Sequence, residues 1–144
     1  MPSEHLESKQ GEVEVAKAAA NAFGRAVTDG EIDAFLPFLA QEVDFELPSA
    51  MQDAVMRLNG HDEVRGYLQQ TAEEYEELHL EWKEIRETGD GRYLMLGSWQ
   101  ATVRKTQTRF GTPMGLVFDV RDGEVTRLRA FFDEQLAIEA AGRD

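Results

Sequence analysis

Two alternating stretches near the end of the chain flank the dipeptide Asp122-Gly123, and this pattern limits the fold more than any other. Residues 114–121 and 124–132 alternate apolar and polar side chains, as strands with one buried face do. Asp-Gly is a preferred two-residue β-turn because both positions tolerate positive φ angles. The pattern therefore predicts a β-hairpin, followed by a short helix over residues 134–141 that ends at Gly142.

The length of the turn decides which side chains of the hairpin share a face. With a two-residue turn, counting back from Asp122-Gly123 places Asp119 opposite Thr126. Residues 115, 117 and 119 then share one face with residues 126, 128, 130 and 132. A wider turn would reverse the facing of the side chains on the first strand, and Leu116 and Phe118 would then lie on that face instead. The sequence leaves both alternatives open.

The N-terminal half carries the apolar spacing of helices. Residues 12–28 place apolar side chains at steps of three and four, and an Asp-Gly pair follows them as a typical helix end. A shorter helix is predicted over about residues 31–39, and a third over about residues 61–75. Residues 1–11 are polar and are predicted to form a flexible tail, which makes residues 12–144 a single folded domain.

The remaining segments alternate as strands do. Strands are predicted over residues 42–47, 79–87 and 92–104, in addition to the hairpin. Residues 48–60 are interpreted as a long connection, and residues 105–109 as a loop or an exposed strand end. We therefore expect an α+β fold in which a curved antiparallel sheet wraps around three N-terminal helices. This arrangement forms a cone with an internal pocket, closed by the short C-terminal helix.

Composition excludes several classes of partner. The chain has 28 acidic and 15 basic side chains and a net charge of −13, a field that repels phosphate backbones and anionic membranes. Neither nucleic acid nor a membrane is therefore an expected partner. The absence of cysteine fits a reducing cytoplasm, and no apolar run approaches the roughly 20 residues of a membrane helix. A cytoplasmic location is predicted.

The sequence gives no indication of a metal or cofactor. Histidine occurs three times, at His5, His61 and His79, and no two of these have the spacing of metal ligands. No glycine-rich phosphate loop links a strand to a helix, so a nucleotide cofactor has no support. Neither a metal nor a cofactor is expected.

Three segments together carry a resemblance to a known family. They are TDGEIDAFLPFLAQEVDFELP at residues 28–48, NGHDEVRGYL at residues 59–68, and DVRDGEVTRLRAFFDEQLAIEAAG at residues 119–142. In order and spacing they resemble the SnoaL-like branch of the nuclear transport factor 2-like superfamily, over residues 12–142. The resemblance implies the cone fold of ketosteroid isomerase. It does not imply one reaction, because isomerases, cyclases, hydrolases, dehydratases and binding modules share this scaffold.

The resemblance also indicates where other branches place catalytic groups. In the ketosteroid isomerase branch, a tyrosine, a carboxylate base and a second acid act together. The matching positions here are Phe23, Leu47, and Gly115 or Leu116, all without an ionisable group. The aspartate that limonene-epoxide hydrolases carry in the last strand corresponds to Ala130. Neither chemistry is expected of this chain.

Asp119 is the remaining candidate for acid–base catalysis. A pocket acid of this kind serves the SnoaL polyketide cyclases, and a two-residue turn would place Asp119 toward the edge of the pocket. The alternative is a strand-end aspartate that is exposed or paired with an arginine such as Arg127. Asp133 is interpreted as the N-cap of the closing helix rather than as a catalytic acid.

The predicted pocket is apolar, and part of its lining comes from the resemblance to ketosteroid isomerase relatives. The residues predicted to line it are Phe23, Leu47, Met51, Val117, Leu128, Ala130 and Phe132. Trp82 and Trp99 are interpreted as core or dimer-interface residues rather than as a ligand platform. Arg127 and Arg129 alternate with the pocket set and should lie on the convex face of the sheet. Superfamily members often dimerise through that face, and a homodimer is predicted.

Two functions remain open from the sequence. The first is binding of a small hydrophobic molecule in the apolar cavity, with isomerase- or cyclase-like turnover if the protein is an enzyme. The second is a module without catalysis, which either binds a ligand or interacts with another chain through the convex sheet. The apolar residues at the known catalytic positions favour a binding site over any established reaction of this fold.

Overall fold

The computed structural model describes residues 2–48 and 55–142. The elements in chain order are α1 (Pro2–Asp29), α2 (Ile32–Phe35), the 3-10 turn η1 (Leu36–Phe38), β1 (Leu39–Pro48), β2 (Val55–Asn59), α3 (His61–Glu74), β3 (Tyr75–Gly89), β4 (Arg92–Val103), β5 (Thr108–Arg121), β6 (Glu124–Phe131) and α4 (Glu134–Ala141).

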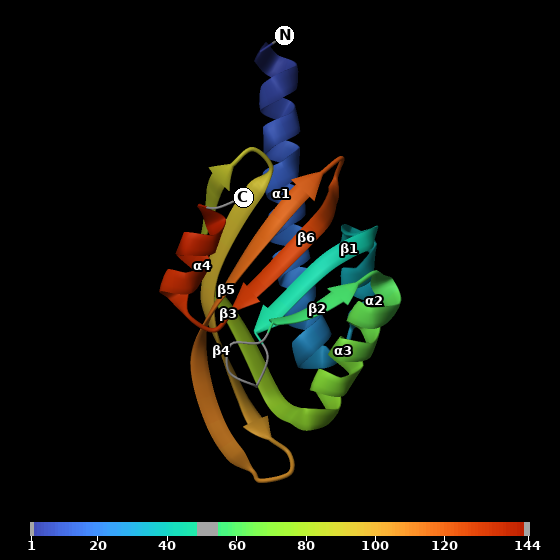
Figure 1. Ribbon diagram of the computed structural model, residues 1–144, viewed down its shortest axis with the longest axis vertical. Helices are drawn as coiled ribbons and strands as arrows, with labels where there is room; N and C mark the ends of the chain where they lie inside the picture. The colour runs from blue at the N-terminus through green and yellow to red at the C-terminus, as the bar shows by residue number, and fades with distance from the viewer. Residues whose placement is uncertain (1, 49–54, 143–144) are drawn as a thin grey trace.

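The six strands form one curved sheet in the order β2-β1-β6-β5-β4-β3. Neighbouring strands are antiparallel except β1 and β6, which run parallel. Figure 1 shows α1 crossing one face of the sheet and α4 lying on the opposite face. We call these the inner and the outer face. The α+β fold is thus the predicted one, with one parallel pair within the sheet.

Most of the core lies between the inner face and α1, α2 and α3. Phe45, Leu116, Phe118 and Leu128 are completely buried there. Helix α1 lies close to the sheet because its buried side is mainly alanine, at positions 16, 19, 20, 22 and 26. Each buried leucine or phenylalanine contributes about 1.5–3 kcal/mol relative to an exposed one. The inner face therefore supplies most of the driving force for folding.

A second, smaller cluster lies on the outer face under α4. Ala137, Ala140 and Ala141 of α4 pack against Leu94, Leu96 and Val117 of the sheet. Gly115 permits this close contact, since a Cβ atom placed there would come within 2.3 Å of the Ala137 Cβ. The Asp133 carboxylate accepts a 2.9 Å hydrogen bond from the Leu136 amide, which confirms the predicted N-cap.

Several element boundaries differ from the sequence prediction, and three of these differences are large. Helix α1 begins at Pro2 rather than near residue 12, so residues 2–11 continue the helix and project beyond the sheet (Figure 1). β2 lies within the segment interpreted as a connection, and pairs antiparallel with β1. β5 begins at Thr108, which extends the hairpin by one long, polar strand end. β2 has only five residues, and alternation of apolar and polar side chains over so short a segment does not distinguish a strand from a loop.

The hairpin turn has two residues, as predicted, but a β-bulge follows it. Arg121 pairs with Glu124, and Asp122 and Gly123 both have positive φ angles, of 53° and 80°. Thr126 is then an extra residue in β6, so that Asp119 lies opposite Arg127. The extra residue reverses the facing of β5 relative to β6 over the rest of the hairpin.

Of the two facings of β5 that the sequence leaves open, the structure has the one with Leu116 and Phe118 on the inner face. Leu116 pairs with Ala130 and Phe118 with Leu128, and these four side chains are buried in the core of the inner face. Val117 and Asp119 lie on the outer face instead. The reversal that the sequence attributed to a wider turn comes from the bulge.

Candidate functional site

A small apolar cavity lies between the inner face of the sheet and helices α1 and α3. It is lined by Phe23, Val27, Leu47, Tyr67, Thr71, Leu78, Leu80, Trp99, Met114 and Phe132. Its volume is about 30 Å³, enough for only one or two water molecules. Ligand pockets generally measure about 300–1,000 Å³. Side chains thus nearly fill the cone, and a ligand would have to displace some of them.

Trp99 and Phe132 form an aromatic wall of the site, and Tyr75 and Phe110 pack against Trp99. Trp99 stacks on Phe132 with 5.7 Å between ring centroids and 18° between ring planes. Tyr75 and Phe110 contact the same indole edge to face, at 5.3 and 5.1 Å. Phe132 retains 38% of its accessible surface, so this ring is the part of the wall that reaches solvent. Trp99 packs against the inner core, in agreement with its interpretation as a core residue, and it also lines the cavity.

Few polar groups reach the cavity. The Trp99 Nε1–H is buried and has no hydrogen-bond partner among the described residues. The Thr71 hydroxyl donates a 3.0 Å hydrogen bond to the Tyr67 carbonyl oxygen within α3. Burial raises the pKa of the Tyr67 hydroxyl above its ordinary value of 10.0, so this group is protonated at neutral pH. None of the described lining residues carries a carboxylate.

The predicted pocket residues fall into four groups. Phe23, Leu47 and Phe132 line the cavity. Leu128 and Ala130 belong to the same inner core without lining the cavity. Val117 lies on the outer face under α4, so its predicted place in the pocket is wrong. Met51 lies outside the residues that the structure describes.

The sequence prediction did not identify the cavity-lining residues on α3, β4 and β5. Tyr67 and Thr71 lie one turn apart in a helix, and nothing in that spacing indicates that they border a cavity. Met114 and Trp99 come from β5 and β4, where the inward face depended on the unrecognised bulge. Alternation along each strand could have found them once one inward residue was known.

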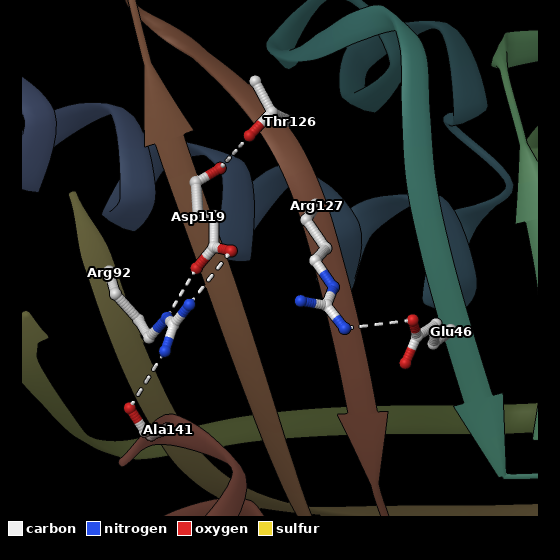
Figure 2. Close-up of polar contacts among 6 residues, drawn as sticks. All are labelled: Glu46, Arg92, Asp119, Thr126, Arg127 and Ala141. Atoms are coloured by element: carbon white, nitrogen blue, oxygen red, sulfur yellow. Dashed lines mark hydrogen bonds and ion pairs between the residues drawn. The ribbon is translucent and has the colours of Figure 1, made fainter. Parts of the chain in front are cut away.

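Asp119 does not face the cavity. Its carboxylate accepts hydrogen bonds from Arg92, with 2.8 Å from Nε to Oδ1 and 3.5 Å from Nη2 to Oδ2 (Figure 2). Arg92 Nη1 also lies 3.5 Å from the Ala141 carbonyl oxygen at the end of α4. The alternative of an arginine partner is thus the correct one, although the arginine is Arg92 and Arg127 instead bonds Glu46 at 3.1 Å. The bulge explains why the predicted facing failed.

The histidines have structural surroundings. His61 Nε2 lies 3.0 Å from the Leu39 carbonyl oxygen, which ties the start of α3 to β1. The exposed His79 lies 3.5 Å from a Glu81 carboxylate oxygen. Within residues 2–48 and 55–142, no group of three or more His, Cys, Asp or Glu side chains could hold a metal ion.

A larger hollow lies on the outer side of β3, β4 and β5, next to the start of α4. Its volume is about 730 Å³, and it is open to solvent. Lys83 and Glu134 form a 3.0 Å ion pair at its border. The mixed polar lining and the open form are those of a surface groove, whereas the space inside the cone is smaller and mainly apolar.

The fold is similar to that of solved nuclear transport factor 2-like and ketosteroid isomerase-like structures. The sequence profile of the SnoaL-like domain family matches residues 20–128, and the chain belongs to this family. A search of curated proteins finds no match. No helix in the described part of the chain is long and apolar enough to cross a membrane.

Three solved structures illustrate the likeness. A nuclear transport factor 2-like protein of unknown function from Burkholderia pseudomallei is 21% identical, with a TM-score of 0.72 over 92% of this chain and 98% of that chain. A candidate polyketide cyclase from Xanthomonas campestris is 22% identical, with a TM-score of 0.66 over 90% and 98%. TerC, co-crystallised with polyporic acid, is 20% identical, with a TM-score of 0.70 over 92% and 99%. At these identities the likeness concerns the fold.

Proposed function

We propose that this SnoaL-like protein binds a small, largely apolar molecule in the cavity between the sheet and helices α1 and α3. The aromatic wall around Trp99, with the half-exposed Phe132 at its edge, is the observation that carries the proposal. Stacked aromatic rings next to an unpaired indole N–H suit a flat apolar ligand. TerC, which has the same fold, was co-crystallised with polyporic acid, and this is consistent with the proposal.

Binding without turnover is the form that the described lining favours. Its polar groups are an indole N–H and two hydroxyls, which can hold a ligand but are poor bases at neutral pH. Isomerase- or cyclase-like turnover is the second candidate, since a candidate polyketide cyclase shares the fold. Incubation of the bound ligand with the protein, followed by mass spectrometry, separates the two. Recovery of unchanged ligand supports binding alone.

Tryptophan fluorescence gives a direct test, because the chain has two tryptophans. In a Trp82→Phe variant, Trp99 is the single tryptophan and reports on the cavity. Titration with naphthalene or 1-naphthol should change its emission in a saturable way and raise the melting temperature. Absence of saturation for a series of such aromatic probes would contradict a ligand site here.

A cavity-filling variant tests whether the probes bind inside the cone, and a surface variant with the same new ring is its control. Val27 lies on α1 against the cavity, and Val27→Phe should remove the remaining space and weaken probe binding at least tenfold. Leu136→Phe introduces the same ring at a position that is 51% exposed on α4. The Leu136 variant should bind the probes like the parent protein.

A homodimer through the outer face is a separate proposal. Arg127 and Arg129 lie on that face, opposite Leu128 and Ala130, as the alternation predicts. Helix α4 covers Leu94, Leu96 and Val117, so the surface left for a second copy centres on β1, β6 and β2. Analytical ultracentrifugation at micromolar concentration tests this, and a strictly monomeric protein would refute it.

A further inference from the structure

Arg129 is a buried charge on the side of the sheet away from the cavity. It lies on β6, between Glu46 of β1 and Val117 of β5 in the register of the sheet. Only 6% of its surface is accessible, so its guanidinium has lost most of its contact with water. A buried guanidinium is costly unless hydrogen bonds and a counter-charge replace that water.

The neighbouring carboxylates are already used by other arginines. Asp119 is held by Arg92, and Glu46 accepts a 3.1 Å bond from Arg127 (Figure 2). Glu46 is also 3.9 Å from the exposed Arg57. The central part of the outer face thus brings together more guanidinium groups than carboxylates, although the whole chain has a net charge of −13. This local excess of positive charge in an acidic protein indicates a surface suited to an anion.

The unpaired donors of Arg129 lie on one edge of its guanidinium. Nε and Nη2 are both buried, and neither has a hydrogen-bond partner among the residues that the structure describes. These two N–H groups point in parallel and match the spacing of two carboxylate oxygens. Arg92 uses the same edge, Nε and Nη2, to hold the two oxygens of Asp119. The protein thus contains an occupied example of the arrangement that Arg129 leaves open.

The electrostatic surroundings of Arg129 also favour the binding of an anion. Burial lowers the pKa of Arg129 below its ordinary value, and the charges of Arg127 and Arg92 lower it further, while Asp119 and Glu46 only partly compensate. The charged form is therefore held in an unfavourable setting. An additional negative charge at the free edge would stabilise it.

We propose that Arg129 anchors a binding site for a small carboxylate on the outer face, with the anion bound across Nε and Nη2. Glu46 and Arg127 border the site, with 19% and 32% of their side chains exposed, and a small anion would reach Arg129 by displacing them. Nε–H and Nη2–H each donate one hydrogen bond to one carboxylate oxygen. This site is independent of the apolar cavity, because it lies on the opposite face of the sheet.

Formate is the probe that tests the site, because it is the smallest carboxylate. The full chain is titrated with sodium formate at constant ionic strength, maintained with sodium chloride. The Nε–Hε signal of Arg129 is followed by NMR, together with the melting temperature. We expect a saturable shift of that signal and a rise in melting temperature with formate that chloride does not produce. A response identical in the two salts would overturn the proposal.

Two substitutions at Arg129 separate charge from geometry. Arg129→Met removes the positive charge and the two N–H donors. It should abolish the formate response while leaving the fold intact, since no described group loses a hydrogen bond. Arg129→Lys keeps the charge without the two-donor edge, and should bind formate at least tenfold more weakly. Equal binding by the lysine variant would refute the proposed geometry and so overturn the site.

A control at the same face completes the experiment. Arg57→Met removes an arginine whose side chain is 76% exposed, and should retain the full formate response. The source of the carboxylate is tested by protein concentration. Should the signal of Arg129 shift with protein concentration in the absence of formate, a carboxylate of a second copy occupies the edge and the small-anion proposal fails.

Discussion

Arg92 on β4 and Asp119 on β5 form an ion pair across the outer face, with 2.8 Å between Nε and Oδ1. Both side chains are largely buried, at 17% and 20% exposure, and the same arginine lies 3.5 Å from the Ala141 carbonyl oxygen. The pair therefore links β4 and β5 with the last turn of α4. Its position assigns Asp119 to the stability of the outer face rather than to the chemistry of the cavity.

Replacing Asp119 by asparagine tests this assignment. Asp119→Asn keeps the shape but removes the charge that Arg92 pairs with, and should lower the free energy of unfolding by about 1–3 kcal/mol. Binding of aromatic probes in the cavity should not change. Urea denaturation and probe titration measure the two effects. A variant with native stability and no probe binding would show that Asp119 acts at the cavity after all.

Gly115 determines how closely α4 approaches the sheet. A Gly115→Ala variant would place its Cβ 2.3 Å from the Ala137 Cβ, so α4 has to shift away from Leu96 and Val117. We expect a loss of about 1–3 kcal/mol in the free energy of unfolding, as for other overpacked sites. Urea denaturation gives this value.

The control for Gly115 is another glycine with free space. A Cβ at Gly66, within α3, meets no atom within 4 Å. Gly66→Ala should stabilise the protein by about 0.5–1 kcal/mol, because alanine favours a helix more than glycine does. If both alanine variants behaved alike, close packing of α4 on Gly115 would not be the cause.

Local signals in the sequence were sufficient for much of the fold. The α4 bounds followed from Asp133 as N-cap and Gly142 after the last turn, and both local signals are present in the structure. The start of α1 could not be found in this way, because residues 2–11 are polar and lack the apolar stripe on which the helix prediction depended. β2 escaped for a related reason, since five residues give too few alternations.

The candidate site was harder to predict, because one inserted residue changed every assignment along β5. The two-residue turn at Asp122-Gly123 was correctly read, yet Thr126 bulges out and its hydroxyl bonds the Asp119 carbonyl oxygen at 3.2 Å. Val120, Val125 and Thr126 are all β-branched and favour strands, so their identity does not indicate a bulge. The sequence could therefore predict the hairpin but not its facing, and Val117 and Asp119 were placed on the wrong side.

The two tryptophans should differ in what their indole N–H groups contribute. Trp82 Nε1 donates a 3.2 Å hydrogen bond to the Ala20 carbonyl oxygen of α1, whereas Trp99 Nε1 has no partner among the described residues. Both substitutions to phenylalanine remove similar volume, but only Trp82→Phe also breaks a bond between α1 and β3. We expect Trp82→Phe to cost about 0.5–1.5 kcal/mol more than Trp99→Phe in urea denaturation. Equal losses would mean that the bond to Ala20 contributes little.

Tyr93 gives the protein a pH dependence in the alkaline range. Its side chain is 1% exposed and its hydroxyl has no hydrogen-bond partner among the described residues. Burial raises the pKa of Tyr93 to about 12, and the charges of Glu12 and Glu87 act in the same direction. The unfolded chain loses this proton near pH 10, while the folded chain keeps it until about pH 12. Stability should therefore fall between these values, by at most about 1.4 kcal/mol per pH unit from this group.

Tyr93→Phe isolates that effect. Phenylalanine fills the same space without the unpaired hydroxyl, so at pH 7 the variant should match or exceed the parent protein in its free energy of unfolding. Between pH 10 and 12 its stability should decline less steeply, with the remaining slope arising in part from Tyr67, whose pKa is also raised by burial. Urea denaturation at pH 7, 10 and 11 measures both quantities. Parallel curves for the two proteins would show that the Tyr93 hydroxyl ionises with equal ease in the folded and the unfolded chain.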